Sequence, residues 1–213
     1  MTVCGVDEAG KGSVIGPMVT AGVLVKDVTE LEDLDIRDSK QLTTRRRMKL
    51  YDEIVLRWKT TIVVKTPAEI DARLGTMNAF TASCHASVIK SLLPNMAFVD
   101  ACDVNAARFG SNVARLSGIS ELRVISEHKA DDKFLIVGAA SIVAKVTRDL
   151  LVTELSNMFG PVGSGYPSDH VTIRFLEEYI RAHRHPPLCA RQTWKTVNEI
   201  KARVSQQCLV DFF

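Results

Sequence analysis

The chain has 213 residues and a mass of 23.5 kDa, which suits one large domain or a domain with a small appendage. Hydrophobic residues make up 46% and charged residues 24%, which excludes disordered, collagen-like and membrane classes. The net charge is only +2, so the total charge by itself does not indicate nucleic acid as a partner. Because Asp7 and Glu8 interrupt the first apolar run and no C-x-x-C pair occurs, we expect a cytoplasmic protein.

Apolar runs and helical spacing predict alternating strands and helices along the chain. We expect strands over residues 1–6, 17–25, 60–65, 96–99 and 124–126. We expect helices over residues 43–58, 80–94, 134–151 and 170–184. Glycines and prolines predict turns over 159–167, and a short segment around Trp194 precedes a tail. This order favours a single α/β or α+β domain.

Four carboxylates lie at or just beyond the ends of predicted buried strands: Asp7, Glu8, Asp100 and Asp131. The carboxyl ends of strands in an open α/β sheet meet at one edge, so these side chains can converge. Close carboxylates need cations, and oxygen ligands select Mg²⁺ or Mn²⁺, two of which could activate a water molecule. Adjacent strand residues point to opposite faces, so Asp7 and Glu8 converge only if their strand ends or bulges there. Solvated turn acids remain the alternative.

A glycine-rich stretch follows the first two acids. Residues 5–12 nearly match the pattern G-x-x-x-x-G-K-[ST] of nucleotide phosphate loops, but Gly12 replaces the hydroxyl and two acids would repel phosphate. That assignment is therefore excluded. What the sequence supports is a Gly10-Lys11-Gly12 backbone that a polyanion can approach closely, with a plain turn as the alternative.

Two further sets of residues, a basic segment and the histidines, need an interpretation. Ser39 and Lys40, followed by arginines 45–47, offer a phosphate platform at a helix start, or else a solvated basic face. The histidines, His85 included, are interpreted as surface or capping residues rather than metal ligands. 

The end of the chain combines a polar residue with an apolar cluster. Gln206, Leu209, Phe212 and Phe213 fit the pattern Q-x-x-[aliphatic]-x-x-[aromatic]-[aromatic]. One helical turn would gather the three apolar side chains into a plug for a groove on a partner. Docking of the same plug on the protein's own core is the alternative.

Seven segments, in the same order along nearly the whole chain, resemble ribonuclease HII of the archaeal type. They are residues 5–12 (GVDEAGKG), 38–42 (DSKQL), 99–103 (VDACD), 127–131 (EHKAD), 139–145 (AASIVAK), 163–169 (GSGYPSD) and 194–196 (WKT). The resemblance implies a ribonuclease H-like α/β fold, with a central mixed sheet flanked by helices and a small helical C-terminal extension. It also implies a catalytic domain over residues 1–185 with the extension over 186–205 packed on it. The tail over 206–213 separately resembles the clamp-binding peptide of replication and repair proteins.

The implied activity is endonucleolytic cleavage of RNA in RNA–DNA hybrids and of single ribonucleotides in duplex DNA, which leaves 3′-hydroxyl and 5′-phosphate ends. The resemblance makes Asp7, Glu8, Asp100 and Asp131 the ligands of two Mg²⁺ or Mn²⁺ ions. It gives Gly10-Lys11-Gly12 the reading of the ribose 2′-hydroxyl and Tyr166 the orientation of the junction sugar. The tail would bind a ring-shaped sliding clamp, and the protein is expected to be a monomer without a membrane partner.

One departure concerns the glycine-rich loop, where many members carry arginine at the position of Lys11. A lysine cannot form the same planar fork, which puts its contact with a substrate phosphate in doubt. Two alternatives to the nuclease remain at this point. They are a different carboxylate-based hydrolase, for example a glycosidase, and a non-catalytic clamp-binding adaptor.

Overall fold

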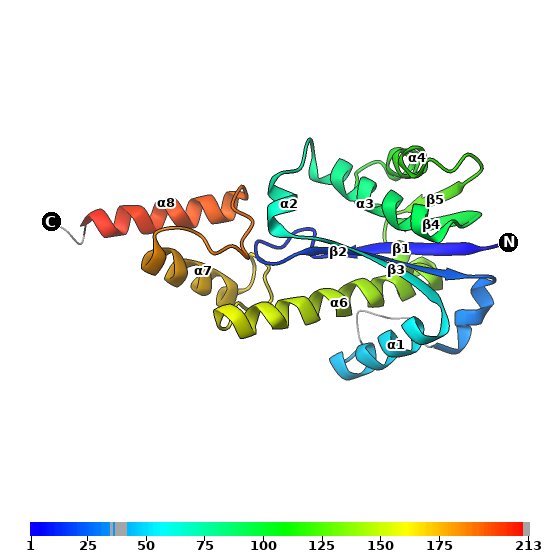
Figure 1. Ribbon diagram of the computed structural model, residues 1–213, viewed down its shortest axis with the longest axis horizontal. Coiled ribbons are helices and arrows are strands. Elements are labelled where there is room, and N and C mark those ends of the chain that lie inside the picture. The colour runs from blue at the N-terminus through cyan, green and yellow to red at the C-terminus, as the bar shows by residue number, and fades with distance from the viewer. Residues whose placement is uncertain (35, 37–41, 211–213) are drawn as a thin grey trace. The chain divides into compact units, whose positions relative to one another are not determined.

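The computed structural model describes residues 1–34, 36 and 42–210, with side chains described as far as Gln206. Within these residues five strands form one mixed sheet in the order β3-β2-β1-β4-β5 (Figure 1). The strands are β1 (Val3–Ala9), β2 (Met18–Val25), β3 (Lys59–Lys65), β4 (Met96–Asp100) and β5 (Arg123–Glu127). Strand β1 is antiparallel to β2 and parallel to β4, and β4 is parallel to β5.

The chain divides into two compact units. The sheet unit consists of Met1–Lys11, Val19–Val64 and Leu74–Thr147, and the helical unit consists of Gly12–Met18, Lys65–Arg73 and the chain from Arg148 onward. The helices of the sheet unit are η1 (Val28–Leu34), α1 (Thr44–Arg57), α3 (Met77–Leu92), α4 (Ala106–Ser117), α5 (Ala130–Lys133) and the first part of α6 (Leu135–Phe159). The helical unit has α2 (Pro67–Asp71), the rest of α6, α7 (His170–His183) and α8 (Lys195–Val210).

The two faces of β1 contact different helices. Cys4 and Val6 lie in a buried cluster with Val88 of α3 and Phe109 of α4. Figure 1 shows α3 and α4 on one side of the strands. Gly5 faces the start of α6 so closely that an added Cβ would lie 2.2 Å from the carbonyl oxygen of Ile136. Successive residues of β1 therefore alternate between the α3 face and the α6 face, which sets the direction of the acids that follow.

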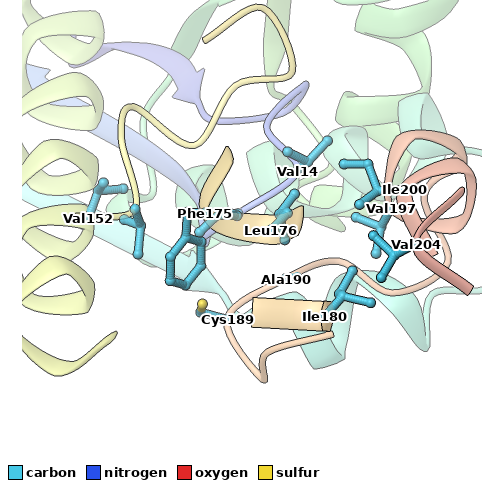
Figure 2. Close-up of a cluster of buried hydrophobic side chains, with 12 residues drawn as sticks. Val14, Val152, Phe175, Leu176, Ile180, Cys189, Ala190, Val197, Ile200 and Val204 are labelled. Carbon is cyan, nitrogen blue, oxygen red and sulfur yellow. The ribbon is translucent and has the colours of Figure 1, made fainter. Parts of the chain in front are cut away.

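The helical unit has a core of its own (Figure 2). Its buried members are Val14, Ile15, Val152, Val162, Phe175, Leu176, Ile180, Cys189, Ala190, Val197, Ile200 and Val204. Next to an isolated bridge between Ile15 and Ala190, the fully buried Arg191 donates to the hydroxyl of Ser13 at 2.8 Å and to the Gly16 carbonyl. These bonds satisfy a guanidinium that would otherwise be costly to bury.

Most predicted elements are present, and the differences have local causes. The predicted helix over 80–94 begins earlier, because Thr76 caps α3 by accepting from the backbone nitrogen of Ala79. Helix α4 was not predicted, although Asn105 caps its start and Gly118 ends it with φ near 70°. Phe109 and Val113 recur at helical spacing on its buried face, so the periodic signal was also available. Helix α8 is longer than the short segment expected around Trp194 and continues into the predicted tail.

Candidate active site

The pairing of β1 with β4 ends before either strand ends. Their parallel ladder runs from Val3 opposite Met96 to Val6 opposite Val99, whereas β1 stays paired with β2 as far as Ala9. The next residues of the two strands, Asp7 and Asp100, thus lie beyond the last pair. Glu8 follows directly, so three carboxylates come to the carboxyl end of adjacent parallel strands, as predicted from the sequence.

The strand neither ends nor bulges at the first two acids, contrary to the condition set from the sequence. Asp7 lies opposite Ala21 and Glu8 opposite Thr20 in a regular antiparallel register. The side chains of Asp7 and Glu8 therefore lie on opposite faces of the sheet. Asp7 is on the α6 face near Ser141, and Glu8 is on the α3 face.

Asp7 is the most deeply buried of these acids, with 6% of its surface exposed. One of its oxygens, Oδ1, accepts a hydrogen bond from the backbone nitrogen of Glu8 at 2.7 Å. Burial raises the pKa of Asp7 well above its usual value, and the negative charges of Glu8 and Asp100 raise it further. The nearby Ser141 hydroxyl acts in the opposite direction. A cation at this place would relieve the unfavourable charge.

Asp100 links β4 to the start of α5, the helix that carries the fourth acid. Its Oδ1 accepts from the backbone nitrogen of Ala130 at 2.7 Å, at the first residue of α5. Burial raises the pKa of Asp100, and Glu8 and Asp131 add to the rise although the bond from Ala130 lowers it. Asp131 lies 3.8 Å from Nζ of Lys145 in α6. The four predicted carboxylates are therefore close enough to affect one another electrostatically.

Glu8 has a partner that the sequence did not reveal. Its Oε2 lies 2.7 Å from Nε2 of His85 in α3, and the His85 side chain is fully buried. The interpretation of His85 as a surface or capping residue is wrong. Its place in the middle of a buried helix face, among Cys84, Val88 and Ile89, was the available signal.

Across the described part of the chain, no three His, Cys, Asp or Glu side chains are already grouped as a metal-ligand set. The donor chemistry nonetheless fits a hard cation, because the site presents carboxylate oxygens from β1, β4 and α5. Burial and mutual repulsion raise the pKa of both Asp7 and Asp100, so positive charge would stabilise their ionised forms. Asp7, Glu8, Asp100 and Asp131 are the residues that could hold it.

The glycine-rich stretch next to β1 has two distinct parts. Gly10 has φ of 81°, and the ammonium of Lys11 donates to Oδ1 of Asn78 at 2.7 Å and to the carbonyl of Cys102 at 3.1 Å. These bonds direct the lysine toward α3 and the end of β4. Gly12, in the helical unit, is exposed and has no atom within 4 Å of where a Cβ would stand. Its backbone is thus accessible to a large ligand.

Tyr166 lies half-buried in the turn before α7, within the helical unit. The guanidinium of Arg148, itself 4% exposed, lies 4.6 Å from the centre of the Tyr166 ring and also donates to the Ser164 carbonyl. Asp169 caps α7 and accepts from the backbone nitrogen of Ser164, and these bonds lower the pKa of Asp169 to about 2. The turn that carries Tyr166 is therefore fixed at both ends.

The remaining predicted site residues are only partly described. Ser39 and Lys40 lie outside the described residues, whereas Arg45, Arg46 and Arg47 form the first turn of α1. Gln206 is exposed on α8, and Leu209 belongs to the same helix. Phe212 and Phe213 lie outside the described residues.

Comparison with known proteins connects this arrangement to one family. The Ribonuclease HII family model matches residues 4–197. The chain belongs to the ribonuclease HII family. A curated ribonuclease HII from Methanocorpusculum labreanum is 61% identical over 213 residues, which cover all of both chains.

Solved structures of relatives share the fold. The crystal structure of ribonuclease H2 from Pyrococcus horikoshii is 41% identical, with a TM-score of 0.91 over 97% of this chain and 100% of that chain. Ribonuclease HII of Archaeoglobus fulgidus, solved in a complex with PCNA, is 42% identical, with a TM-score of 0.86 over 92% and 96%. These similarities confirm the ribonuclease H-like fold expected from the sequence. In the described part of this chain, no helix is long and apolar enough to cross a membrane.

Proposed function

We propose that the protein cleaves the RNA strand of RNA–DNA hybrids, and the 5′ side of ribonucleotides embedded in duplex DNA, at the carboxylates Asp7, Glu8, Asp100 and Asp131. The ends left are a 3′-hydroxyl and a 5′-phosphate. Membership of the ribonuclease HII family makes the chain a nuclease of RNA–DNA hybrids. The observation that supports this site is the end of the β1–β4 ladder, where burial and neighbouring acids raise the pKa of Asp7 and of Asp100.

These carboxylates would hold two divalent cations, Mg²⁺ or Mn²⁺. Bound there, the cations would supply an activated water molecule and the positive charge that phosphodiester hydrolysis needs. The pKa values of Asp7 and Asp100 are raised, so bound cations would stabilise the ionised forms of these two carboxyl groups. Glu8 and Asp131, held near His85 and Lys145, would complete the ligand set.

Recognition of RNA would come from two places that flank the chemistry in the sequence. The backbone of Gly10, Lys11 and Gly12 would read the ribose 2′-hydroxyl, which distinguishes RNA from DNA. The contacts of Lys11 with Asn78 and Cys102 favour this backbone role over a side-chain contact with phosphate. Tyr166, with Arg148 against its ring, would orient the sugar at the junction. Ser39 and Lys40 would contact a phosphate farther along the duplex.

A sliding clamp is the proposed protein partner. The relative from Archaeoglobus fulgidus was solved bound to PCNA, and the C-terminal tail of this chain has the pattern of a groove-binding plug. Gln206, Leu209, Phe212 and Phe213 would bind the clamp, while residues 1–185 form the catalytic domain and 186–205 the extension. We further propose that the protein is a monomer. We place it in the cytoplasm, where thiols such as Cys4 and Cys102, both free, stay reduced.

The site assignment is tested with neighbouring acids of one helix. Asp131→Asn should lower cleavage of a duplex with a single ribonucleotide by at least about 100-fold, the effect of losing several kcal/mol of charge stabilisation. Asp132→Asn removes the same charge from the adjacent, exposed position of α5 and should change the rate by less than about 3-fold. Circular dichroism checks that both variants fold. Equal rates in the two variants would remove Asp131 from the site.

Metal dependence is tested on the unmodified protein. Cleavage should stop in excess chelator and return on addition of Mg²⁺ or Mn²⁺. Activity that persists in chelator would contradict the metal-assisted mechanism and favour a carboxylate hydrolase that works without metal.

A further inference from the structure

His85 is a buried polar residue with one hydrogen-bond partner among the described residues. Its Nε2 lies 2.7 Å from Oε2 of Glu8, and since a carboxylate oxygen only accepts, Nε2 must donate. No described residue pairs with Nδ1, which is also buried. Glu8 is therefore the only group in the described structure that accounts for a polar ring at this place.

Most of the buried neighbours of His85 on α3 are apolar, with Thr81 as the polar exception one turn earlier. His85 belongs to the buried face of α3 with Cys84, Val88 and Ile89, and the ring of Phe109 from α4 meets it edge to face at 5.3 Å. A leucine or phenylalanine would satisfy such a site without leaving a buried nitrogen unpaired. The packing holds the imidazole in one orientation, so the position of Nε2 is fixed by the core rather than by the carboxylate.

Glu8 in turn is a side chain with three rotatable bonds and only 8% of its side-chain surface exposed. The bond to His85 occupies Oε2 and leaves Oε1 as the oxygen available to another ligand. A glutamate fixed in advance loses no conformational freedom when that ligand binds. Groups that orient the ligands of a metal commonly change metal affinity by 10- to 100-fold when they are removed.

We propose that His85 is a positioning residue, which fixes the Glu8 carboxylate so that its second oxygen is ready for a divalent cation. The proposal rests on the function proposed above, in which Glu8 is a metal ligand. It assigns a part of the site to α3, a helix that contributes no acid to it. The packing between α3 and α4 holds His85, and His85 in turn holds the Glu8 carboxylate on β1.

Three substitutions at position 85 test the proposal. In His85→Gln the side-chain amide nitrogen can reach the position of Nε2. In His85→Asn the shorter side chain places its amide nitrogen near the position of Nδ1. His85→Phe fills the space without a hydrogen-bond donor. Mn²⁺ affinity is measured in the absence of substrate by electron paramagnetic resonance or calorimetry. We expect about 10- to 100-fold weaker binding in His85→Phe and His85→Asn, and recovery of most of the affinity in His85→Gln.

A packing control separates positioning from stability. Phe109→Leu removes the ring that meets His85 but leaves the donor, so it should lower the melting temperature while Mn²⁺ affinity stays within about 2-fold of the unmodified protein. The Mg²⁺ concentration for half-maximal cleavage should follow the Mn²⁺ affinities. Recovery by glutamine but not by asparagine is the result that a purely structural histidine would not produce.

Two results would overturn this proposal and leave the proposed function intact. One is unchanged Mn²⁺ affinity in His85→Phe, and the other is equal affinity in His85→Gln and His85→Asn. A different result, in which the unmodified protein neither binds Mn²⁺ nor needs a metal for cleavage, would overturn the proposed function and with it the role of Glu8. The two failures are therefore distinguishable.

Discussion

Single residues of this site show how burial changes an ordinary acid. Asp7 is almost fully covered, and burial together with its neighbours Glu8 and Asp100 raises its pKa. An exposed aspartate at a turn would have no such cost, so the alternative of solvated turn acids does not fit Asp7. Burying such a carboxyl costs stability, which is common at functional sites and agrees with the proposed role of Asp7 as a metal ligand.

The raised pKa of Asp7 predicts how stability depends on pH. A carboxyl with a higher pKa in the folded state binds more protons there than when unfolded, so the free energy of unfolding falls as pH rises from about 4, the ordinary aspartate range, through the folded pKa. Urea unfolding of the metal-free protein at pH 4 to 8 should show this fall. Asp7→Asn should lack that part of it.

Added Mn²⁺ should offset the same loss above neutral pH, because a bound cation stabilises the ionised carboxylate. Parallel pH profiles for the unmodified protein and Asp7→Asn would show that Asp7 is not the group responsible.

Among the elements, β1 organises the site through its two faces. Its α6 face carries Gly5 and then Asp7, and its α3 face carries Val6 and then Glu8. Close approach of α6 to the strand depends on the missing side chain at Gly5. The same regular alternation that builds the core therefore places the two acids on opposite faces of the sheet, beyond the end of the β1–β4 ladder.

Glycine-to-alanine changes test this packing. In Gly5→Ala the new Cβ would lie 2.2 Å from the Ile136 carbonyl oxygen and 2.3 Å from its carbon, so α6 must move. We expect the free energy of unfolding to fall by about 3 kcal/mol, the upper range for overpacked cores. Gly12→Ala is the control because it meets open space, and it should change stability by less than about 0.5 kcal/mol. Denaturant titration measures both, and equal losses would contradict the packing account.

For the molecule as a whole, the net charge of +2 understates its capacity to bind nucleic acid. The acids of the site cancel lysines and arginines in the total, although bound cations would neutralise them in use. Affinity for DNA should consequently be moderate and sensitive to salt, and a clamp would raise the effective concentration on DNA.

Removal of the tail tests the proposed clamp contact. A variant that ends at Ser205 should lose binding to a PCNA ring in calorimetry, while cleavage of a short duplex with one ribonucleotide stays within about 2-fold. Leu188→Ala, which removes an exposed leucine of the helical unit, serves as the control and should keep clamp binding. Loss of cleavage on truncation would give the tail a structural role. A full-length protein that binds the clamp but cleaves no substrate would favour the adaptor.

Sequence patterns predicted most strands and helices and placed Asp7, Glu8, Asp100 and Asp131 at strand ends. They missed α4, although its cap Asn105, its terminal Gly118 and the helical spacing of Phe109 and Val113 were visible. They also missed His85, since a single histidine in a helix has no partner within hydrogen-bond reach along the sequence. Its partner lies 77 residues away, on another element.

The sequence by itself determined the family and the order of most elements, and it singled out the four candidate acids, because these depend on local patterns and on residue types in a fixed order. Tertiary structure decided how those acids are arranged. Asp7 and Asp100 both lie beyond the last residue pair of the β1–β4 ladder. Only the packing of α3 against the sheet brings His85 to Glu8. Such contacts join residues far apart in the chain, and their geometry follows from packing rather than from any local pattern.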